Sequence, residues 1–239
     1  MKSNPAVLKF QKECFAIYLT DIQNKVNGFP KRYVYPDGNP IRPVIPVQTT
    51  TNKIMLVGAF PSARFEQRNG KLIPVGDNLA PFGPEHYFDG SQVRIQESTE
   101  SLHKNYFPQL GIERTDLWIT DIVKIYLYPD KHLKNFDSSG FVDTHKLFPK
   151  IAEASLEWFK EELKVCNPKL IITLGEVAAR VVSQNSKPSL DGVIRDLSYA
   201  DNIKIVHLAH PEIRRRNPEW DKRTKVHLRE LAKQIKKYL

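Results

Sequence analysis

Four short apolar runs constrain the fold more than any other feature of this sequence. They span residues 54–57, 116–125, 169–175 and 203–209, and they have the length and composition of strands buried in a sheet. The segments between them carry apolar residues at helical spacing. Strands that alternate with helices favour a parallel sheet that is covered on both faces. We therefore expect an α/β fold, a three-layer α/β/α sandwich around a central four-stranded parallel sheet.

Amphipathic segments flank these runs. The clearest covers residues 145–165, where five apolar side chains fall near one face and Pro149 comes early enough for the first helical turn. An earlier stripe of Val7, Phe10 and Cys14 begins another helix. We expect this helix over 6–26, and further helices over 97–107, 176–183 and 219–239.

Two stretches carry no helical or strand pattern. Residues 28–52 hold five prolines and predict an extended connection across the surface. Residues 67–96 contain four glycines and several aromatic residues, and they predict a long irregular loop that binds a flat ligand or caps the core. We expect one domain overall, with residues 1–52 packing as a helix and connection on a core of residues 53–239.

Charge and cysteine content narrow the class of protein. Lysine and arginine exceed aspartate and glutamate by 36 to 27, a net charge of +9, which favours a polyanionic partner. Cys14 and Cys166 are the only cysteines and lie far apart in sequence, so neither a disulfide framework nor a cysteine-built metal site is expected. The N-terminus lacks an apolar signal region, and no run reaches the roughly 18 apolar residues of a membrane span. We expect a cytoplasmic monomer with no membrane segment, metal or cofactor.

The end of the first apolar run carries the first candidate site. Gly58 allows a sharp turn there, Pro61 fixes the backbone, and Ser62 offers a hydroxyl and an amide to an anion. Ligands of open α/β sheets bind at such carboxyl ends of strands. Taken alone, the segment is equally compatible with an ordinary strand-to-loop corner.

Two other strand ends also carry polar residues. Asp121 follows Thr120 in the second run, and His210-Pro211 follows the fourth. A lone histidine at such a place more often caps the strand end than acts in chemistry. The arginine run 214–216 that comes next is, by itself, most often a solvated charged surface.

Together, the three strand ends resemble the uracil-DNA glycosylase superfamily. That family places a G-x-x-P turn after its first strand, a polar base-reading residue at the end of a middle strand, and an H-P turn after its last strand. Two further segments, Pro168–Val182 and Ile119–Lys124, are similar to the family's strand-LG-helix and ITN-type signatures. The resemblance covers residues 54 to 216.

The resemblance implies roles for several residues. Departure of a base leaves negative charge on the base and positive charge on the sugar, so a donor near the base oxygen accelerates the reaction. His210 matches the family's electrophilic donor, and Phe82 matches its stacking aromatic. The resemblance places the other base-binding residues at Gly58, Ala59, Phe60, Tyr87 and Asp121, with Phe60 and Tyr87 as reserve stacking residues.

Two departures from the family pattern change the expected chemistry. Ala59 and Phe60 stand where relatives carry the Asp, Asn or Glu that positions water, so Asp77 or Glu66 is our candidate to replace it. Asp121 stands where relatives carry an amide that reads uracil. An ionised carboxylate only accepts hydrogen bonds, so we expect a base edge rich in donors, from an amino-bearing or modified base rather than uracil.

The resemblance also implies contacts with DNA. Arginines after the H-P turn can stack on a base and grip phosphates. A branch of the family binds an iron–sulfur cluster through four cysteines. This chain has only two cysteines, so we expect no such cluster. We expect DNA-binding residues at Pro61, Ser62, Arg64, Pro211, Arg214, Arg215 and Arg216, with Lys222 and Arg223 extending the basic rim.

These inferences lead to one expected function and two alternatives. The expected function is a monofunctional DNA glycosylase-like hydrolase that releases a damaged or deaminated base, uracil or a related one, from single- or double-stranded DNA. The first alternative is a catalytically silent member of the superfamily that binds nucleic acid or a nucleobase, which Phe60 favours. The second is a small-molecule nucleoside hydrolase, which needs no arginine wedge and no salt-dependent binding.

Overall fold

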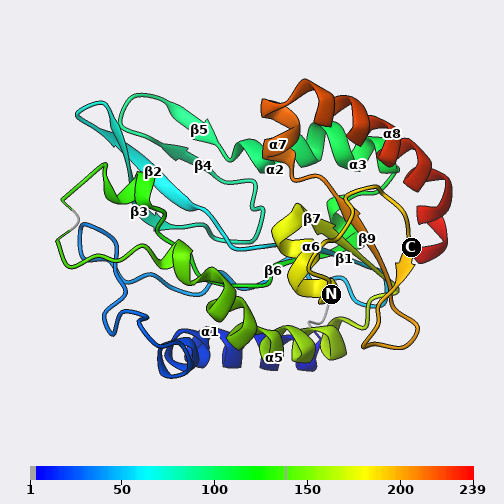
Figure 1. Ribbon diagram of the computed structural model, residues 1–239, viewed down its shortest axis with the longest axis horizontal. Coiled ribbons are helices and arrows are strands. Elements are labelled where there is room, and N and C mark those ends of the chain that lie inside the picture. The colour runs from blue at the N-terminus through cyan, green and yellow to red at the C-terminus, as the bar shows by residue number, and fades with distance from the viewer. Residues whose placement is uncertain (1–3, 138) are drawn as a thin grey trace.

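The computed structural model describes residues 4–137 and 139–239, which contain a central sheet of five strands (Figure 1). Its spatial order is β6 (Leu117–Asp121), β1 (Ile54–Gly58), β7 (Leu170–Leu174), β9 (Lys204–Leu208) and β8 (Arg195–Asp196). The first four strands are parallel and correspond to the four apolar runs, so the α/β prediction is confirmed. The expected count of four strands is corrected by β8, a two-residue antiparallel edge strand whose exposed side chains leave no apolar pattern to detect.

The register of the sheet brings the carboxyl ends of the four parallel strands to one edge. Gly58 at the end of β1 pairs with Asp121 at the end of β6, and Leu174 of β7 pairs with Leu208 of β9. Every residue of β1, β6 and β7 is buried, as expected for strands covered on both faces. Any ligand at this edge therefore meets residues that follow several different strands.

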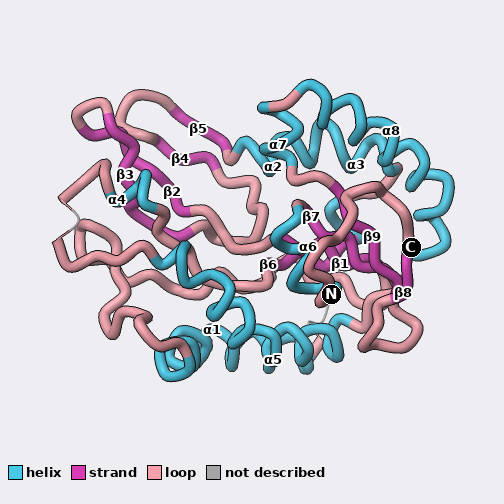
Figure 2. Tube along the Cα trace, viewed as in Figure 1, coloured by secondary structure: helices cyan, strands magenta, loops and turns pink. Residues whose placement is uncertain are grey.

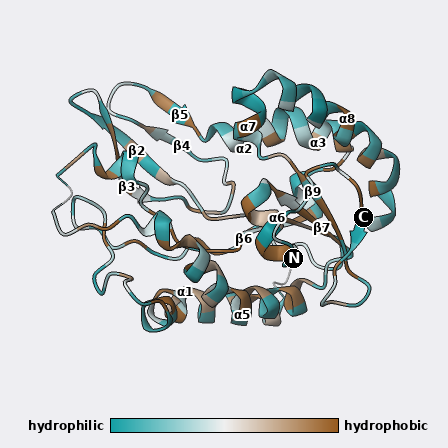
Figure 3. Ribbon diagram, in the orientation of Figure 1, coloured by the Kyte–Doolittle hydropathy of each residue, from teal (hydrophilic) through white to brown (hydrophobic). Residues whose placement is uncertain are grey.

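Helices cover both faces of the sheet. Helices α1 (Pro5–Lys25) and α5 (Phe148–Cys166) lie side by side on one face, where α6 (Glu176–Ser183) joins the same apolar cluster. Helices α3 (Phe107–Leu110) and α8 (Pro218–Ile235) pack together on the other face. In Figure 3 the central strands are hydrophobic whereas the outward surface of α8 is hydrophilic, as its position requires.

Local signals explain where the helices begin and end. Asn4 caps α1 by accepting a hydrogen bond from the amide of Ala6, and Pro149 occupies the first turn of α5 as expected. A short 3-10 helix, Thr144–Leu147, precedes α5. The helix predicted over 97–107 is present as three consecutive helical segments. These are α2 (Glu97–Ser101), a π-helical turn over Leu102–Tyr106, and α3.

The prediction of an irregular loop over 67–96 is wrong, because most of this segment forms two antiparallel hairpins (Figure 2). Strands β2 (Ala63–Arg68) and β3 (Lys71–Asp77) form the first, and β4 (His86–Phe88) and β5 (Val93–Ile95) the second. Asn69 and Gly70 both have positive φ, 50° and 74°, in the turn of the first hairpin. An Asn-Gly pair of this kind is a strong hairpin signal.

The connection over 28–52 contains isolated bridges and no strand or helix. Its Tyr33, Tyr35 and Ile41 are buried in the apolar cluster that α1 and α5 share with the sheet. The described chain also contains two short α-helices, α4 (Asp130–Leu133) and α7 (Pro211–Arg216), and two further 3-10 helices, Arg114–Asp116 and Lys236–Tyr238. No helix within the described ranges combines the length and apolar character needed to cross a bilayer.

Candidate functional site

Four residues converge at the carboxyl edge of the sheet: Gly58, Asp121, Phe82 and His210. A Cβ atom added to Gly58 would overlap Oδ1 of Asp121 and would lie 2.7 Å from Cε2 of Phe82. The rings of Phe82 and His210 have centroids 6.2 Å apart. Gly58 is therefore required here because a carboxyl and an aromatic ring occupy the space of a side chain.

Asp121 and His210 come from strands that are not neighbours in the sheet. They follow β6 and β9, and β1 and β7 lie between those strands. Three strand spacings of about 4.8 Å separate the two backbones by roughly 14 Å. A flat ligand stacked on Phe82 would still lie near both groups, because Asp121 Oδ1 and Phe82 both approach Gly58 and the His210 ring is 6.2 Å from the Phe82 ring.

His210 is held as a neutral hydrogen-bond donor. Its side chain caps α7, with Nδ1 accepting a hydrogen bond from the amide of Glu212 at 3.2 Å. Burial lowers the pKa of His210 to about 4, so the ring is uncharged at pH 7. Because Nδ1 is the acceptor, the single proton of the ring is on Nε2, which is left to donate.

Gly175, which the sequence did not single out, supports the histidine. It follows β7 with a φ of 87°, and a Cβ atom there would lie 3.1 Å from the Cβ of His210. Tyr106 supports the same turn by donating a hydrogen bond to the carbonyl of Ala209 at 2.8 Å. The histidine therefore projects from a turn fixed on two sides.

Asp121 carries a buried carboxyl at the end of β6. The residue is 2 % exposed, and its carboxyl makes no hydrogen bond to any residue that the structure describes. Burial raises the pKa of Asp121 to about 7; Lys124 opposes this rise and Glu162 adds to it. Near neutrality the acid is thus partly un-ionised, which alters the acceptor-only role expected from sequence.

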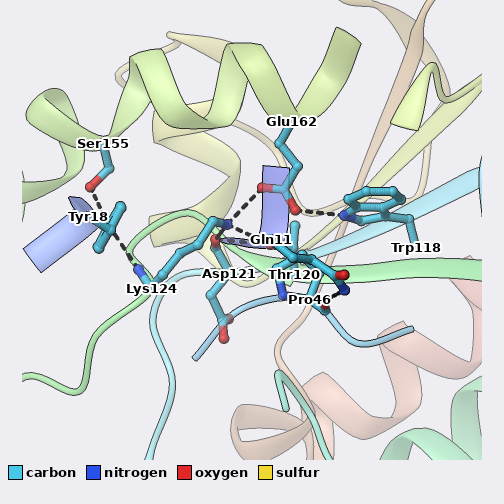
Figure 4. A network of polar contacts seen from close by, with 9 residues as sticks. All are labelled: Gln11, Tyr18, Pro46, Trp118, Thr120, Asp121, Lys124, Ser155 and Glu162. Carbon is cyan, nitrogen blue, oxygen red and sulfur yellow. Dashed lines mark hydrogen bonds and ion pairs between the residues drawn. The ribbon is translucent and has the colours of Figure 1, made fainter. Parts of the chain in front are cut away.

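An ion pair of Lys124 and Glu162 is buried next to Asp121 (Figure 4). Nζ of Lys124 donates to Oε2 of Glu162 at 2.7 Å, to Oγ1 of Thr120 at 2.7 Å and to the backbone carbonyl of Asp121 at 2.8 Å. Nε1 of Trp118 donates to the other carboxylate oxygen of Glu162 at 2.6 Å. In Figure 4 the Asp121 carboxyl points away from the Lys124 ammonium.

The same network reaches α1. The Tyr18 hydroxyl accepts a hydrogen bond from the Lys124 amide at 3.0 Å and lies 2.5 Å from the Ser155 hydroxyl of α5. Sequence reasoning missed these residues. The available signals were a lysine inside the apolar run 116–125 and a glutamate on the apolar face of α5.

Side chains from elsewhere also hold the loop that carries Phe82. Phe82 has a φ of 47°, an unfavourable conformation for an aromatic residue. Arg114 donates to the carbonyl of Phe82 at 2.7 Å and to that of Pro81 at 3.3 Å. The Glu85 carboxylate accepts from two amides at the start of the loop, at 2.6 and 3.1 Å. The strained ring position is therefore maintained by an arginine and a glutamate that sequence did not identify.

The family model described as "Uracil DNA glycosylase superfamily" matches residues 46–236, which is most of the chain. The chain belongs to the uracil DNA glycosylase superfamily. The suspected resemblance is thereby confirmed at the level of the superfamily. A search of the curated proteins finds no match to this chain.

Within this superfamily member, the two carboxylates predicted to position water lie in the β2–β3 hairpin. Asp77 accepts hydrogen bonds from the Tyr35 hydroxyl at 2.7 Å and from the Arg42 amide at 3.2 Å, and burial raises its pKa. Glu66 pairs with Arg68 at 2.5 Å. The contacts of both carboxylates are with these residues rather than with Asp121, Phe82 or His210, and their catalytic role stays a prediction.

The reserve aromatic residues point elsewhere. Phe60 packs against His145 and Phe148, with ring centroids at 5.4 and 5.7 Å, and Ala59 packs on the same apolar cluster. Tyr87 lies in β4 opposite Arg94 of β5. Phe82 is the aromatic residue that the structure brings to the convergent edge.

The arginine run divides into a buried and an exposed part. Arg214 is 5 % exposed, pairs with Asp221 and lies over the ring of Tyr106. It lines, with Arg215, an open cavity of about 460 Å³ whose lining excludes the Phe82 site. Arg215 and Arg216 are exposed and both pair with Glu212. DNA contacts by all three arginines stay a prediction, although the Arg214 side chain is almost fully buried.

The other residues predicted to contact DNA surround the first turn. The exposed Ser62 hydroxyl donates to Gln96 at 3.2 Å and accepts from Asn78 at 3.3 Å, while Pro61 is buried. The guanidinium of Arg64 lies against Gly76 of β3. Pro211 is buried in the first turn of α7. The described residues contain no group of three or more His, Cys, Asp or Glu arranged to hold a metal ion.

Proposed function

We propose that this superfamily member is a DNA glycosylase-like hydrolase that cleaves the N-glycosidic bond of a deaminated or damaged base. The observation that carries the proposal is the neutral His210, whose Nε2 proton faces away from the Nδ1 cap and is available to a ligand. It follows the last parallel strand, beside a stacking ring and a buried base-edge carboxyl. Superfamily membership supports the same reaction class.

His210 would act by electrostatic stabilisation rather than by proton transfer. Negative charge develops on the carbonyl oxygen of the departing base, and a fixed N–H donor stabilises this charge more than it stabilises the neutral base. With a pKa of about 4, the imidazole is already neutral at pH 7, so it needs no proton loss before it donates. Phe82 would stack the base, and Asp121 would read its edge.

Asp77 is the better of the two candidates for positioning the attacking water. It ends β3 and immediately precedes the loop that carries Phe82, and it is half-buried with a raised pKa. Glu66 instead pairs with Arg68 on the hairpin. Asp77→Asn should therefore slow base release much more than Glu66→Gln.

The target base would reach this site by flipping out of the DNA, because its edge and glycosidic bond are otherwise covered by the stack. The net charge of +9 and the exposed Arg215 and Arg216 would attract phosphates, so binding should weaken with salt. Pro61, Ser62 and Pro211 would support these contacts. We further propose a cytoplasmic monomer, which suits the two free, buried cysteines.

Single-turnover base release tests this function. Labelled single- and double-stranded DNA would carry uracil, hypoxanthine, xanthine or 5-hydroxymethyluracil. Release from at least one substrate should be abolished by His210→Ala and retained by His86→Ala, which alters an exposed histidine in β4. The absence of release from every substrate would refute a hydrolase that acts on these bases.

A catalytically silent nucleic-acid or nucleobase binder is the second candidate. The observation that favours it is the apolar pair Ala59-Phe60 in the first turn, since Phe60 packs on Phe148 and supplies no group to activate water. If this candidate is right, the wild-type protein binds DNA but releases no base. His210→Ala should then weaken DNA binding and change nothing else that is measured.

A further inference from the structure

The Asp121 carboxyl is buried at the site, and none of the residues within 4–137 and 139–239 donates a hydrogen bond to it. Its Oδ1 lies over Gly58 beside Phe82, and the residue is 2 % exposed. The Lys124 ammonium is directed at Glu162, Thr120 and the Asp121 backbone carbonyl instead of the Asp121 carboxyl (Figure 4). A buried carboxylate without hydrogen bonds is costly, whereas the un-ionised acid costs far less.

The charges around Asp121 largely offset one another. The loop after β6 supplies Lys124 and α5 supplies Glu162, whose charged atoms are 2.7 Å apart. Strand β1 brings no titratable group to the carboxyl. Glu85, in the loop that holds Phe82, is bound to two loop amides, and His210 beyond the ring is neutral at pH 7.

The two protonation states of Asp121 present different edges to a base. The un-ionised acid offers one carbonyl acceptor and one hydroxyl donor side by side, which is the pattern of an amide. An imide edge such as that of uracil offers the complement, with N3–H as donor and O4 as acceptor. The carboxylate offers two acceptors, one of which would face the lone pairs of O4.

We propose that Asp121 reads the imide edge of a uracil-type base as an un-ionised carboxylic acid, and that recognition of this edge is lost when the carboxyl ionises. This inference rests on the proposed function. It reverses the expectation from sequence, where an ionised carboxylate disfavoured uracil. Burial, which raises the pKa of Asp121 to about 7, supports it.

The Lys124–Glu162 pair acts here as a positioning device. Lys124 holds the backbone carbonyl of Asp121, and in Figure 4 the Asp121 carboxyl points away from the network. Its Oδ1 instead approaches Gly58, as Phe82 also does. Glu162 also offsets the positive charge of Lys124 by pairing with it. Without Glu162, that positive charge would favour ionisation of Asp121 more strongly. Removing the Glu162 charge should therefore make the acid ionise at lower pH.

The test compares single-turnover release of uracil by wild type and Asp121→Asn between pH 5 and pH 9. The asparagine presents the same donor and acceptor without titrating. Below the pKa of the acid, the two rates should agree within a few-fold. Above it, the wild-type rate should fall relative to the asparagine variant by about tenfold per pH unit, as the un-ionised fraction falls.

Parallel profiles of the two proteins, or a wild-type rate that rises with pH relative to Asp121→Asn, would overturn the inference. Activity of the asparagine variant alone at every pH would also overturn it while leaving the glycosylase function of the site standing. If neither protein releases any base at any pH, the proposed function fails, and the inference that rests on it fails with it.

A pair of variants and a measurement without catalysis complete the test. Glu162→Gln should move the midpoint of the wild-type profile to lower pH, whereas Glu161→Gln, which alters an exposed neighbour paired with Lys164, should not. Unchanged midpoints in both would contradict the role given to the pair. Carbon-13 NMR titration of the Asp121 carboxyl in the free protein should show ionisation near neutrality, and ionisation near pH 4 would overturn the inference without reference to activity.

Discussion

Replacing Asp121 by asparagine should stabilise the protein increasingly as the pH rises. Burial raises the pKa of Asp121 from 3.8 to about 7 in the folded chain. The folded state therefore binds the Asp121 proton more tightly than the unfolded state does. This tighter proton binding contributes its whole stabilising free energy below about pH 4, and the contribution is lost as the pH rises to about 7. Asparagine fills a similar volume and carries no proton to lose.

The size of the effect follows from the shift. A rise of about three pKa units, at about 1.4 kcal/mol per unit, corresponds to roughly 4 kcal/mol in total. The free energy of unfolding of Asp121→Asn minus that of wild type should be constant below pH 4. It should increase by about 1.4 kcal/mol per pH unit up to pH 7, and level off above it.

Urea denaturation at pH 5 and pH 8 measures this difference. Between these values the advantage of the variant should grow by about 2 to 3 kcal/mol, read as a shift of the denaturation midpoint at constant slope. Asp201→Asn, which alters an exposed aspartate in the turn before β9, is the matched control and should show no such growth. A difference for Asp121→Asn that stays constant within about 0.5 kcal/mol would refute the reasoning.

Three further substitutions test the supports of the site. Lys124→Met breaks a buried pair and leaves one carboxylate uncompensated, which should lower the free energy of unfolding by about 3–5 kcal/mol in urea denaturation. Gly58→Ala places a methyl group in the space of Asp121 and Phe82, so base release should be lost while the circular dichroism spectrum is kept. Arg114→Ala frees the carbonyls of the loop that holds Phe82, so the Kd for damaged DNA should rise by about tenfold, which corresponds to the loss of about 1.4 kcal/mol.

Matched variants define what would contradict these three expectations. Lys164→Met alters an exposed lysine of α5 and should cost at most about 1 kcal/mol; an equal loss for Lys124→Met would contradict the account of the buried pair. Unchanged base release in Gly58→Ala would show that no ligand uses the space over Gly58. An unchanged Kd in Arg114→Ala would show that the Phe82 loop keeps its conformation without the arginine.

The parallel sheet and its functional edge could be predicted because their signals are local. Each of the four parallel strands is a short apolar run, and the carboxyl ends of parallel strands meet at one edge. Gly58, Asp121 and His210 therefore could be expected to lie near one another. The hairpin of β2 and β3 was not predicted, although Asn69-Gly70 is a strong turn signal, because the glycines of this stretch also suit an irregular loop.

Because this hairpin was not predicted, the sequence could not distinguish Asp77 from Glu66 as the carboxylate that positions water. Side chains alternate between the two faces of a strand, so a residue in a hairpin has a direction that a residue in an irregular loop lacks. In the hairpin, Asp77 meets Tyr35 and Glu66 meets Arg68. Sequence spacing from Phe82 alone could not supply those directions.

The protonation of Asp121 was also beyond the sequence. It depends on burial and on a pairing between Lys124 and Glu162, which are 38 residues apart and meet only when α5 packs on the sheet. The resemblance identified Asp121 as the base reader, and its carboxyl was expected to be ionised. The three-dimensional surroundings of the carboxyl change that assumption, and with it the expected base.

The most direct test of the account is single-turnover release of uracil from single- and double-stranded DNA at pH 6, comparing wild type, His210→Ala and His86→Ala. The account predicts release by wild type and His86→Ala, with His210→Ala slower by about 100-fold or more, the cost typical of losing one donor to a developing oxyanion. Equal rates for wild type and His210→Ala, or no release by wild type from either form of DNA, would contradict it.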